Sequence, residues 1–360
     1  MKRTGNKRKL KTPLKKKVFV GMSGGVDSSV TAALLKEQGL DVTGVHIKMW
    51  SDPSIPCNFK EDRYDALRAA EKIGIPFQTW DLTEEYRTAV VEYMIAEYAA
   101  GRTPNPDVMC NRHVKFGVFL RTALERGGDA IATGHYVRLA DGHLYEAVDK
   151  NKDQSYFLWT LTQEQLRHAL FPIGGYTKSE VRQMARERGL PTAEKKDSQG
   201  ICFIGEIDLN AFLKKHIPVS RGPVVTTAGK NVGEHEGLAF YTIGQRHGIH
   251  IGGGIPYYVA GKIPANNTLV IAEGPYDAQL FADEMRVSGV NWIGGTPPPL
   301  PLSCHARIRY RQPLQKCVIE EAADDATLRV RFAEPQRAVT PGQSAVFYRG
   351  EEVLGGGVIE

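Results

Sequence analysis

The sequence contains no apolar run long enough to cross a membrane, and its first residues do not resemble a secretory signal peptide. It has only five cysteines in 360 residues, and none of them forms a Cys-x-x-Cys pair. A zinc or iron–sulfur site built from cysteines alone is therefore not expected, and no metal ligand set is readable. These absences predict a cytoplasmic protein with mostly reduced thiols and no membrane association.

The sequence also lacks the Gly-x-x-x-x-Gly-Lys-Ser/Thr motif of the common γ-phosphoryl-transfer enzymes. Its 42% hydrophobic and 24% charged residues are typical of a soluble globular protein. The net charge of +5 is unevenly distributed, because residues 1–17 hold nine Lys/Arg and no Asp or Glu. This basic segment is interpreted either as a disordered, solvated tail or as an electrostatic arm for RNA.

Strand-like and helix-like segments alternate from residue 18 to about residue 136. Strands are predicted over 18–22, 41–49, 77–82 and 130–135, and helices over 28–38, 61–74, 84–100, 114–126, 155–170 and 178–189. Such alternation predicts an α/β fold with a parallel sheet covered by helices. In these sheets a ligand binds beyond the carboxyl ends of the strands.

The residue composition changes after about residue 210, where Gly, Pro and β-branched residues dominate. Alternating stretches at 306–310, 317–320, 327–332 and 344–348 predict a small antiparallel barrel or sandwich. We therefore predict four parts: a basic tail (1–17), a nucleotide-binding α/β domain (18–210), a central β-rich domain (211–280) and a C-terminal β domain (281–360).

The most informative stretch is the glycine- and serine-rich turn after the first predicted strand. Ser23, Gly24, Gly25, Asp27 and Ser28 lead directly into a helix. Glycine lets the backbone approach a ligand, and the free N–H groups and dipole of a helix start attract anions. An ordinary capped turn needs only one such residue. The turn therefore predicts a nucleotide phosphate site, without the lysine of the common loop.

Two polar loops each carry one cysteine. The first, Gly101–Asn111, is stiffened by two prolines and contains Cys110, with Arg112 and Lys115 close by. The second, Lys195–Gly205, contains Cys202 between two apolar residues. Each cysteine alone is equally well an incidental or buried thiol. Together they suggest a pair of thiols that passes sulfur or closes a transient disulfide.

Three further segments carry polar and aromatic groups suited to nucleotides or RNA. Thr133–Tyr136 ends a predicted strand, and Asn151–Tyr156 is read as a capped helix start or an RNA contact. Alternation in Arg307–Gln312 would point Arg307, Arg309 and Arg311 to one face of a strand. That face is either a solvated edge or a surface for the RNA backbone and unstacked bases.

These motifs resemble those of the tRNA-specific 2-thiouridylases, a family within the PP-loop ATP pyrophosphatases. The resemblance runs from about Val18 to the C-terminus, and the Pro104–Cys110 loop together with Gly200–Phe203 is its most specific part. It implies a PP-loop domain followed by two smaller β-rich domains, the last a β-barrel. It also implies ATP-dependent 2-thiolation of the wobble uridine (position 34) of tRNA, with Mg²⁺ expected beside ATP.

The resemblance implies a role for each matching residue. Cys202 would carry a persulfide, Cys110 would free its sulfur and end in a Cys110–Cys202 disulfide, and Asp107 would act as a base. ATP would be held by Gly21, Met22, Ser23, Gly24, Gly25, Val26, Asp27, Ser28, Ile47 and Gly134. The tRNA would be contacted by Asn105, Pro106, Asp107, Lys152, Asp153, Gln154, Arg309 and Tyr310. Many members have methionine where Ile47 stands, but a backbone contact to adenine would survive that change.

The implied partners are tRNA and a persulfide donor, either a cysteine desulfurase or a sulfur-relay protein, and a monomer is expected. Two alternatives remain open at this point. A PP-loop synthetase or amidotransferase acting on a small molecule would share the phosphate turn but needs no pair of cysteine loops. A nucleotide-regulated RNA-binding module would bind tRNA without turnover.

Overall fold

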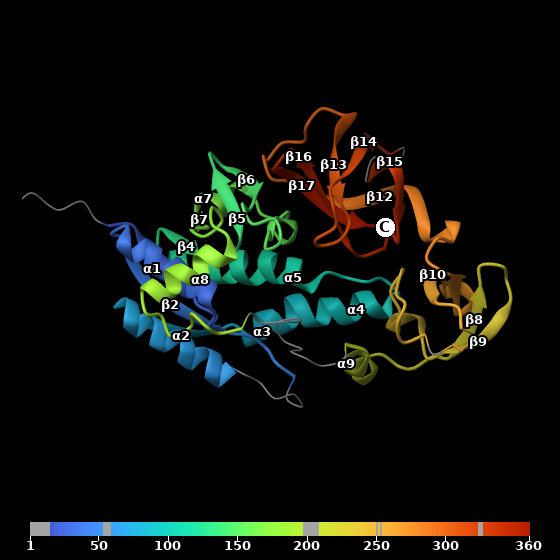
Figure 1. Cartoon of the computed structure of the whole chain (residues 1–360), viewed down its shortest axis with the longest axis horizontal. Coiled ribbons are helices and arrows are strands. Elements are labelled where there is room, and N and C mark those ends of the chain that lie inside the picture. Colours follow the sequence, from blue (N-terminus) through green and yellow to red (C-terminus); the bar gives the residue numbers. More distant parts are fainter. Residues whose placement is uncertain (1–14, 53–58, 197–208, 250, 253, 323–326) are drawn as a thin grey trace, which may run out of the picture.

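A five-stranded parallel sheet forms the first part of the chain, as the alternating pattern predicts (Figure 1). The computed structural model describes residues 15–52, 59–196, 209–249, 251–252, 254–322 and 327–360. The sheet order is β3-β2-β1-β4-β7 and every neighbouring pair is parallel. Its strands are β1 (Lys17–Gly21), β2 (Asp41–Lys48), β3 (Phe77–Asp81), β4 (Ala130–Ala132) and β7 (Ala169–Leu170).

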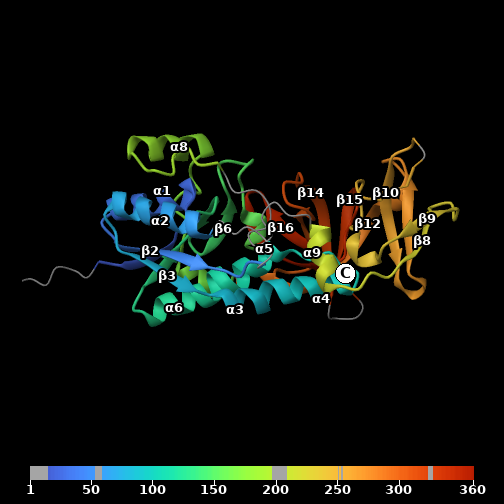
Figure 2. The same ribbon diagram turned by 90° about the horizontal axis from the view of Figure 1, so that it is seen from below.

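Helices cover both faces of this sheet, which explains the continuous apolar run of β1. Val18 and Val20 face a core shared with α1 (Val26–Glu37) and α2 (Phe59–Ile73), whereas Phe19 faces the opposite core. Figure 2 shows α1, α2 and α8 (Lys178–Glu187) on one side of the sheet, and α3 (Thr83–Tyr86) and α6 (Leu120–Glu125) on the other. Among the residues described, no helix is both long and apolar enough to span a bilayer.

The other face is covered by a long helical hairpin that extends from the sheet toward the C-terminal modules (Figure 1). Its outgoing arm is α3 (Thr83–Tyr86), the π-helical η1 (Arg87–Glu92) and α4 (Tyr93–Ala99), and its return arm is α5 (Pro106–Met109), the π-helical η2 (Cys110–Phe119) and α6 (Leu120–Glu125). The predicted helix over 114–126 therefore begins eight residues earlier, at Pro106. Asn105 caps it by accepting the Val108 N–H at 3.2 Å, and proline suits the first helical position.

The prediction of one helix over 155–170 is wrong. This segment holds a 3-10 turn η3 (Ser155–Phe157), the short helix α7 (Gln163–Arg167) and strand β7. Thr162 forms a capping box with Gln165, which starts α7 only there. The sequence analysis also missed the hairpin of β5 (Val137–Ala140) and β6 (His143–Glu146). Asp141 and Gly142 both have positive φ at its turn, so their Asp-Gly pair was the available signal.

Two β modules follow. The central one contains α9 (Leu209–His216) and a four-stranded sheet in the order β10-β11-β8-β9, formed by β8 (Gly222–Thr226), β9 (Asn231–His235), β10 (Tyr257–Ile263) and β11 (Thr268–Glu273). The last is a closed antiparallel barrel of β12 (Phe281–Trp292), β13 (Leu302–Arg307), β14 (Gln315–Glu321), β15 (Leu328–Arg337), β16 (Ser344–Arg349) and β17 (Glu352–Ile359). Pairing of β12 with β17 closes it, which decides between the predicted barrel and sandwich. The β5–β6 hairpin extends the same sheet by pairing with β17.

The tip of the helical hairpin is held by both β modules. The Thr103 N–H donates to the Pro341 carbonyl at 2.8 Å, and Gln343 donates to the carbonyls of Thr103 and Pro104 at 3.0 and 3.1 Å. From the central module, the Lys262 ammonium donates to the Gly101 carbonyl at 2.8 Å, and its burial lowers the pKa of Lys262 to about 8. The hairpin is thus fixed to the sheet at one end and to two modules at the other.

Candidate active site

The turn of residues Ser23–Ser28, for which the sequence predicts a phosphate site, is called the phosphate turn below. It lies after β1, at the carboxyl end of the parallel sheet, where ligands bind in α/β folds. Gly24 adopts φ +84, and a Cβ there would lie 2.3 Å from the Asp62 carbonyl oxygen of α2. The turn is tied internally, since the Ser23 N–H donates to Ser28 Oγ at 3.2 Å and Ser28 Oγ donates to the Gly25 carbonyl at 3.1 Å. Gly25 is the N-cap residue of α1 and has no side chain that could accept from the first turn, so the helix start presents backbone N–H groups that suit an anion. The Gly25 N–H itself donates to Ser23 Oγ at 3.3 Å.

A hydrogen-bonded group joins the start of α1 to the neighbouring strand end. The Tyr136 hydroxyl donates to Asp27 Oδ1 at 2.8 Å, and Lys178 Nζ lies 2.8 Å from both carboxylate oxygens of Asp27. A Cβ at Gly134 would lie 2.8 Å from the Ser28 nitrogen, so only glycine allows this approach. Lys178 was missed by the sequence analysis, because 151 residues separate it from Asp27 and no motif marks it.

Met22 and Ile47 lie on neighbouring strand ends of the same region. Met22 is buried, and its carbonyl accepts a hydrogen bond from His46 Nδ1 at 2.8 Å. Burial lowers the pKa of His46, although this bond opposes the shift. Ile47 is half-buried and pairs in register with Trp80 of β3. The structure thus brings the predicted nucleotide residues of the first, second and fourth strands to one edge of the sheet.

The return arm of the helical hairpin runs to this same edge. Phe119 lies against Gly21, where a Cβ would be 3.6 Å from the ring, and Lys115 Nζ lies 3.5 Å from His135 Nε2, just after β4. Because the lysine ammonium can only donate, His135 accepts at Nε2 and donates from Nδ1 to Thr133 Oγ1 at 2.7 Å. Burial, aided by Lys115, holds the pKa of His135 well below its usual range.

Asp107 and Cys110 lie on the first turns of this return arm. They are therefore on a helix, not on the loop that the sequence analysis predicted. Burial raises the pKa of Asp107, and the Lys115 ammonium partly opposes that rise. The Cys110 side chain is buried, with 3% of its surface exposed, and no disulfide joins any of the described cysteines. Cys202 and Cys57 lie outside the described residues, as do residues 1–14 of the basic segment.

A second cluster joins the hairpin to the barrel. The Tyr156 hydroxyl, hydrogen-bonded to Asn105, donates to the Ser344 carbonyl at 2.8 Å. The Tyr310 ring lies 4.5 Å from that of Phe157, whose carbonyl accepts from Asn111 at 3.4 Å. The Tyr156 ring centroid also lies 6.3 Å from that of Tyr310, so Tyr156 connects Asn105 with the segment that carries Arg309 and Tyr310.

The predicted single face of Arg307, Arg309 and Arg311 is wrong. Strand β13 ends at Arg307, and Arg311 has φ +64 in the following turn. Arg309 is half-buried and donates to the Ile243 carbonyl at 2.8 Å and to Thr340 Oγ1 at 3.1 Å. Turn geometry, which the alternating pattern does not encode, sends the three side chains in different directions.

The loop of Lys152, Asp153 and Gln154 is tied to both clusters. Gln154 Oε1 accepts the Tyr136 N–H at 3.0 Å, and Asp153 accepts from Ala147 and Ser155. Asp153 is only 3% exposed and lies 3.1 Å from Arg307 Nη1. Its carboxylate therefore stabilises the loop from inside and does not face solvent.

The Arg307→Met variant is expected to lose stability. Arg307 pairs with Glu146 at 2.7 Å and Asp153 at 3.1 Å, and both carboxylates are at most 5% exposed. Removing the guanidinium leaves the buried Asp153 carboxylate without its ion-pair partner and leaves Glu146 with Lys150 alone, at 3.2 Å, which costs about 3–5 kcal/mol. Thermal and urea unfolding measure the loss. Arg331→Met is the control, since Arg331 is 52% exposed and its pairs are weak, so a change below about 1 kcal/mol is expected. Equal losses in both variants would contradict this reading.

Comparison with known proteins agrees with this architecture. Three family models match in order: a tRNA methyl transferase HUP domain over 16–206, a tRNA methyl transferase PRC-barrel domain over 210–273 and an aminomethyltransferase beta-barrel domain over 282–359. The tRNA-specific 2-thiouridylases MnmA of Streptococcus thermophilus and of Streptococcus equi subsp. zooepidemicus are each 48% identical over 358 residues, covering 96% of this chain and 95% of theirs.

Two solved structures resemble part of the chain. A 4-thiouridine synthetase–RNA complex with bound ATP is 20% identical and covers 56% of this chain and 50% of its own, with a TM-score of 0.37. The U34-tRNA thiolase NcsA from Methanococcus maripaludis, solved with its [4Fe-4S] cluster, is 20% identical and covers 57% and 69%, with a TM-score of 0.36. The full-length identity to the first pair of relatives, together with the matching domain models, confirms the resemblance noted in the sequence: the chain belongs to the tRNA-specific 2-thiouridylase family.

Proposed function

We propose that this chain is a tRNA-uridine 2-sulfurtransferase that uses ATP to replace the 2-oxygen of the wobble uridine with sulfur. The observation that carries the proposal is the meeting of two elements at one sheet edge. The phosphate turn lies there after β1, and the return arm, which bears Asp107 and Cys110, reaches the same edge through Lys115 and Phe119. These contacts support the proposal because they link the proposed nucleotide site to the helix that carries the buried Cys110.

The first chemical step in this proposal is adenylation of the base. The uridine 2-oxygen attacks the α-phosphate of ATP, pyrophosphate leaves, and the poor leaving group becomes a good one. The uncapped start of α1 suits the phosphates, and the close approach of Gly24 to the Asp62 carbonyl fixes the turn that would hold them. Met22, Ile47 and Gly134 would border adenine and ribose. Mg²⁺ would neutralise phosphate charge; the described residues contain no group of three or more His, Cys, Asp or Glu able to hold it.

The second step replaces AMP by sulfur. A donor of the cysteine desulfurase or sulfur-relay class would load Cys202 with a persulfide. The Cys110 sulfur then attacks the inner sulfur of that persulfide, a Cys110–Cys202 disulfide forms, and the released sulfide displaces AMP from the base. A thiolate is nucleophilic near neutral pH where a hydroxyl is not, which explains the use of cysteine. We further propose that the protein is a monomer and that it works in the cytoplasm, where reductants restore the thiols.

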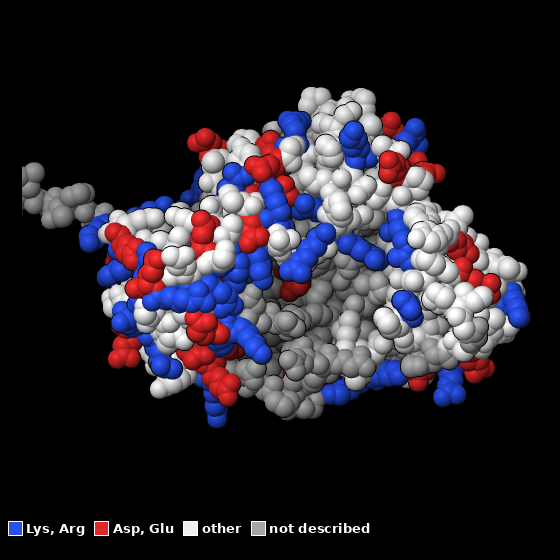
Figure 3. Space-filling model, in the orientation of Figure 1, with Lys and Arg blue, Asp and Glu red and all other residues white. Residues whose placement is uncertain are grey.

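The tRNA in this proposal lies against the junction between the first domain and the barrel. Figure 3 shows Lys and Arg side chains gathered on this face around a hollow. Asn105, Pro106 and Asp107 would border the extruded uridine, and Lys152, Gln154, Arg309 and Tyr310 would contact the RNA around it. Asp153, being buried, would act only by ordering its loop.

One reaction tests the whole proposal. The protein is incubated with ATP, Mg²⁺, sulfide and an unmodified tRNA transcript, and nucleosides and nucleotides are analysed by mass spectrometry. The expected products are 2-thiouridine at the wobble position, AMP and pyrophosphate in equal amounts. Release of ADP, or consumption of ATP without tRNA, would indicate a different PP-loop reaction. Binding of tRNA without any nucleotide turnover would indicate an RNA-binding module.

Removing the charge of Lys115 is expected to move the acidic limb of the pH–rate profile to higher pH. Burial raises the pKa of Asp107 and Lys115 lowers it, so the Lys115→Met variant should raise that pKa further. If the Asp107 carboxylate is the base, activity requires the deprotonated form and falls as pH drops through its pKa. Lys115→Arg keeps the charge and should keep the wild-type limb, and Asp107→Asn should remove the limb along with most activity. An unchanged limb in Lys115→Met would exclude Asp107 as the base.

Replacing Tyr310 is expected to weaken tRNA binding. A base stacked on a tyrosine contributes about 1–3 kcal/mol, so Tyr310→Ala should raise the Kd for tRNA roughly 5- to 150-fold. Filter binding at fixed salt measures this change. Tyr64→Ala is the control, because Tyr64 is 59% exposed on α2, away from the barrel, and the Kd should stay within about twofold. Equal effects of the two variants would remove Tyr310 from the RNA interface.

A further inference from the structure

Two cysteines without a part in the proposed reaction lie together inside the barrel. Cys304 of β13 and Cys317 of β14 are directly opposite each other in the antiparallel register, and their sulfur atoms are 3.7 Å apart. Both are buried, with 8% and 4% of their surfaces exposed. The sequence analysis established only that no two cysteines form a Cys-x-x-Cys pair, and it assigned no role to Cys304 and Cys317.

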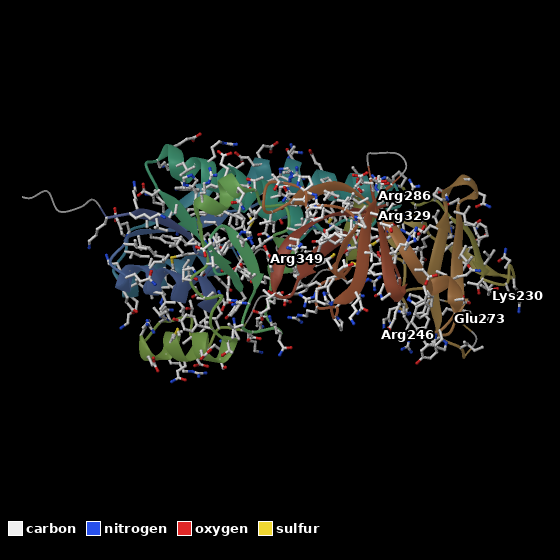
Figure 4. The ribbon with its side chains drawn as sticks, turned by 90° about the horizontal axis from the view of Figure 1, so that it is seen from above. Lys230, Arg246, Glu273, Arg286, Arg329 and Arg349 are labelled. Atoms are coloured by element: carbon white, nitrogen blue, oxygen red, sulfur yellow. The ribbon has the colours of Figure 1, made fainter. Side chains whose placement is uncertain are left out.

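The barrel wall explains why both sulfur atoms point inward. Cys304, Ala306, Cys317 and Ile319 alternate with exposed or half-buried residues and belong to one apolar core. The charged side chains of the wall lie outside, as Figure 4 shows for Arg286 and Arg329, which are paired in register on β12 and β15. The strand register therefore places both cysteines on the inner side of the barrel wall, directly opposite each other on neighbouring strands.

This arrangement meets the geometric needs of a disulfide. Directly opposed residues of antiparallel strands have Cα atoms about 4.5–5.5 Å apart, and disulfides form at Cα separations of about 4.4–6.8 Å. The sulfur atoms can therefore close their 3.7 Å gap by rotation of the side chains, without separating the strands.

We propose that Cys304 and Cys317 are an oxidation site that forms a disulfide across β13 and β14 when the protein meets a small hydroperoxide. One thiol sulfur attacks the O–O bond, which gives a sulfenic acid and one water. The second sulfur then attacks the sulfenic sulfur, forming the S–S bond and releasing a second water. Two S–H bonds and one O–O bond are broken, hydrogen peroxide is reduced to two waters, and the two thiols are oxidised by two electrons.

The rate of this step follows from the environment of the pair. Contact with Cys304 and burial raise the pKa of the Cys317 thiol, so the reactive thiolate is scarce. A small, uncharged peroxide can enter a buried site where a large oxidant such as glutathione disulfide cannot. The pair therefore responds slowly and only to small oxidants.

The bridge would act on the segment between the two strands. Cys304 and Cys317 are 13 residues apart and enclose the turn that carries Arg309 and Tyr310. Closing this ring removes freedom from the unfolded chain and braces the base of the turn. That the braced turn contacts RNA rests on the proposed function, whereas formation of the bridge does not depend on it.

The experiment uses the wild-type, full-length protein. Folded protein is treated with hydrogen peroxide, free thiols are blocked with iodoacetamide in denaturant, and the peptides are mapped by mass spectrometry without reduction. We expect a linked pair of peptides containing Cys304 and Cys317 that separates on reduction. Protein oxidised in concentrated urea is the control and should give mixed cysteine pairs. Recovery of both residues as separate alkylated or sulfinic peptides from folded protein would overturn the proposal.

Two variants guard against misfolding effects and test the bracing. In Cys304→Ser and Cys317→Ala, the remaining partner should be recovered alkylated after the same treatment. The oxidised wild-type protein should also melt a few degrees higher than the reduced protein, a shift absent from both variants. If the linked peptides form but the melting temperature does not rise, the bracing is refuted. Loss of 2-thiouridine formation bears only on the proposed function, because the linked peptides are detected without any reaction of ATP or tRNA.

Discussion

Cys110→Ser is expected to abolish thiolation while leaving adenylation intact. A serine hydroxyl stays protonated near neutral pH and cannot attack a persulfide, so 2-thiouridine formation from a persulfide donor should fall by at least about 10³-fold. The side chain is buried and similar in size to serine, so the fold should be retained. Nucleoside mass spectrometry gives the rate, and pyrophosphate release in a single turnover reports the step before sulfur transfer.

Cys304→Ser is the matched control for this variant. Cys304 is also a buried cysteine, with 8% of its surface exposed against 3% for Cys110, but it lies in the barrel core. Its replacement should leave the reduced enzyme close to wild-type activity. Cys202→Ser should lose transfer from a persulfide donor in the same way as Cys110→Ser. Substantial activity in Cys110→Ser would remove this residue from the sulfur-transfer step.

Gly24→Ala is expected to stop pyrophosphate release. Its Cβ would lie 2.3 Å from the Asp62 carbonyl oxygen, a backbone atom that cannot move without α2, so the turn itself must shift. Displacement of a phosphate-holding backbone by about 1 Å costs on the order of 10²-fold in rate. We expect a loss of about that size or more in tRNA-dependent pyrophosphate release, together with weaker ATP binding by calorimetry.

Gly39→Ala separates this clash from simple backbone strain. Gly39 has φ +83, almost the same as the +84 of Gly24, but no atom lies within 4 Å of the position that an added Cβ would occupy. Both variants therefore suffer the left-handed penalty of about 1–2 kcal/mol in stability, and only Gly24→Ala distorts the phosphate turn. Equal losses of activity in the two variants would mean that general destabilisation explains the effect.

The local sequence pattern predicted the parallel sheet and the position of the glycine- and serine-rich turn, because both depend on residues that are close together in the sequence. The alternation of apolar runs and helix signals indicated the parallel sheet, and the Gly–Ser turn lies at the sheet edge where the α/β rule puts it. The helix that carries Cys110 begins earlier than predicted. Two prolines and an asparagine indicate a loop as readily as a helix start, and here Asn105 caps the helix with Pro106 at its first position. Whether Asn and Pro indicate a loop or the start of a helix therefore depends on the secondary structure that follows them.

Contacts between distant segments could not be predicted from one sequence. Lys178 reaches Asp27 across 151 residues, and Arg307 reaches Asp153 across 154 residues. Nothing in the sequence around one residue of a pair marks its partner, and only packing of the sheet, the β5–β6 hairpin and the barrel brings them together. The same holds for Cys304 and Cys317, whose opposition depends on strand register.

The helical hairpin sets a fixed distance between the first domain and the two β modules. Its outgoing arm runs from Thr83 to Ala99, a span of about 25 Å at 1.5 Å per residue, and its tip is bonded to both β modules. The separation between the phosphate turn and the modules that we propose to contact the tRNA is thus set by helix length. A substrate would then be selected partly by the distance between its reactive base and its gripped stem, so that a helix longer or shorter by one turn would change which RNAs fit, with every contacting side chain unchanged.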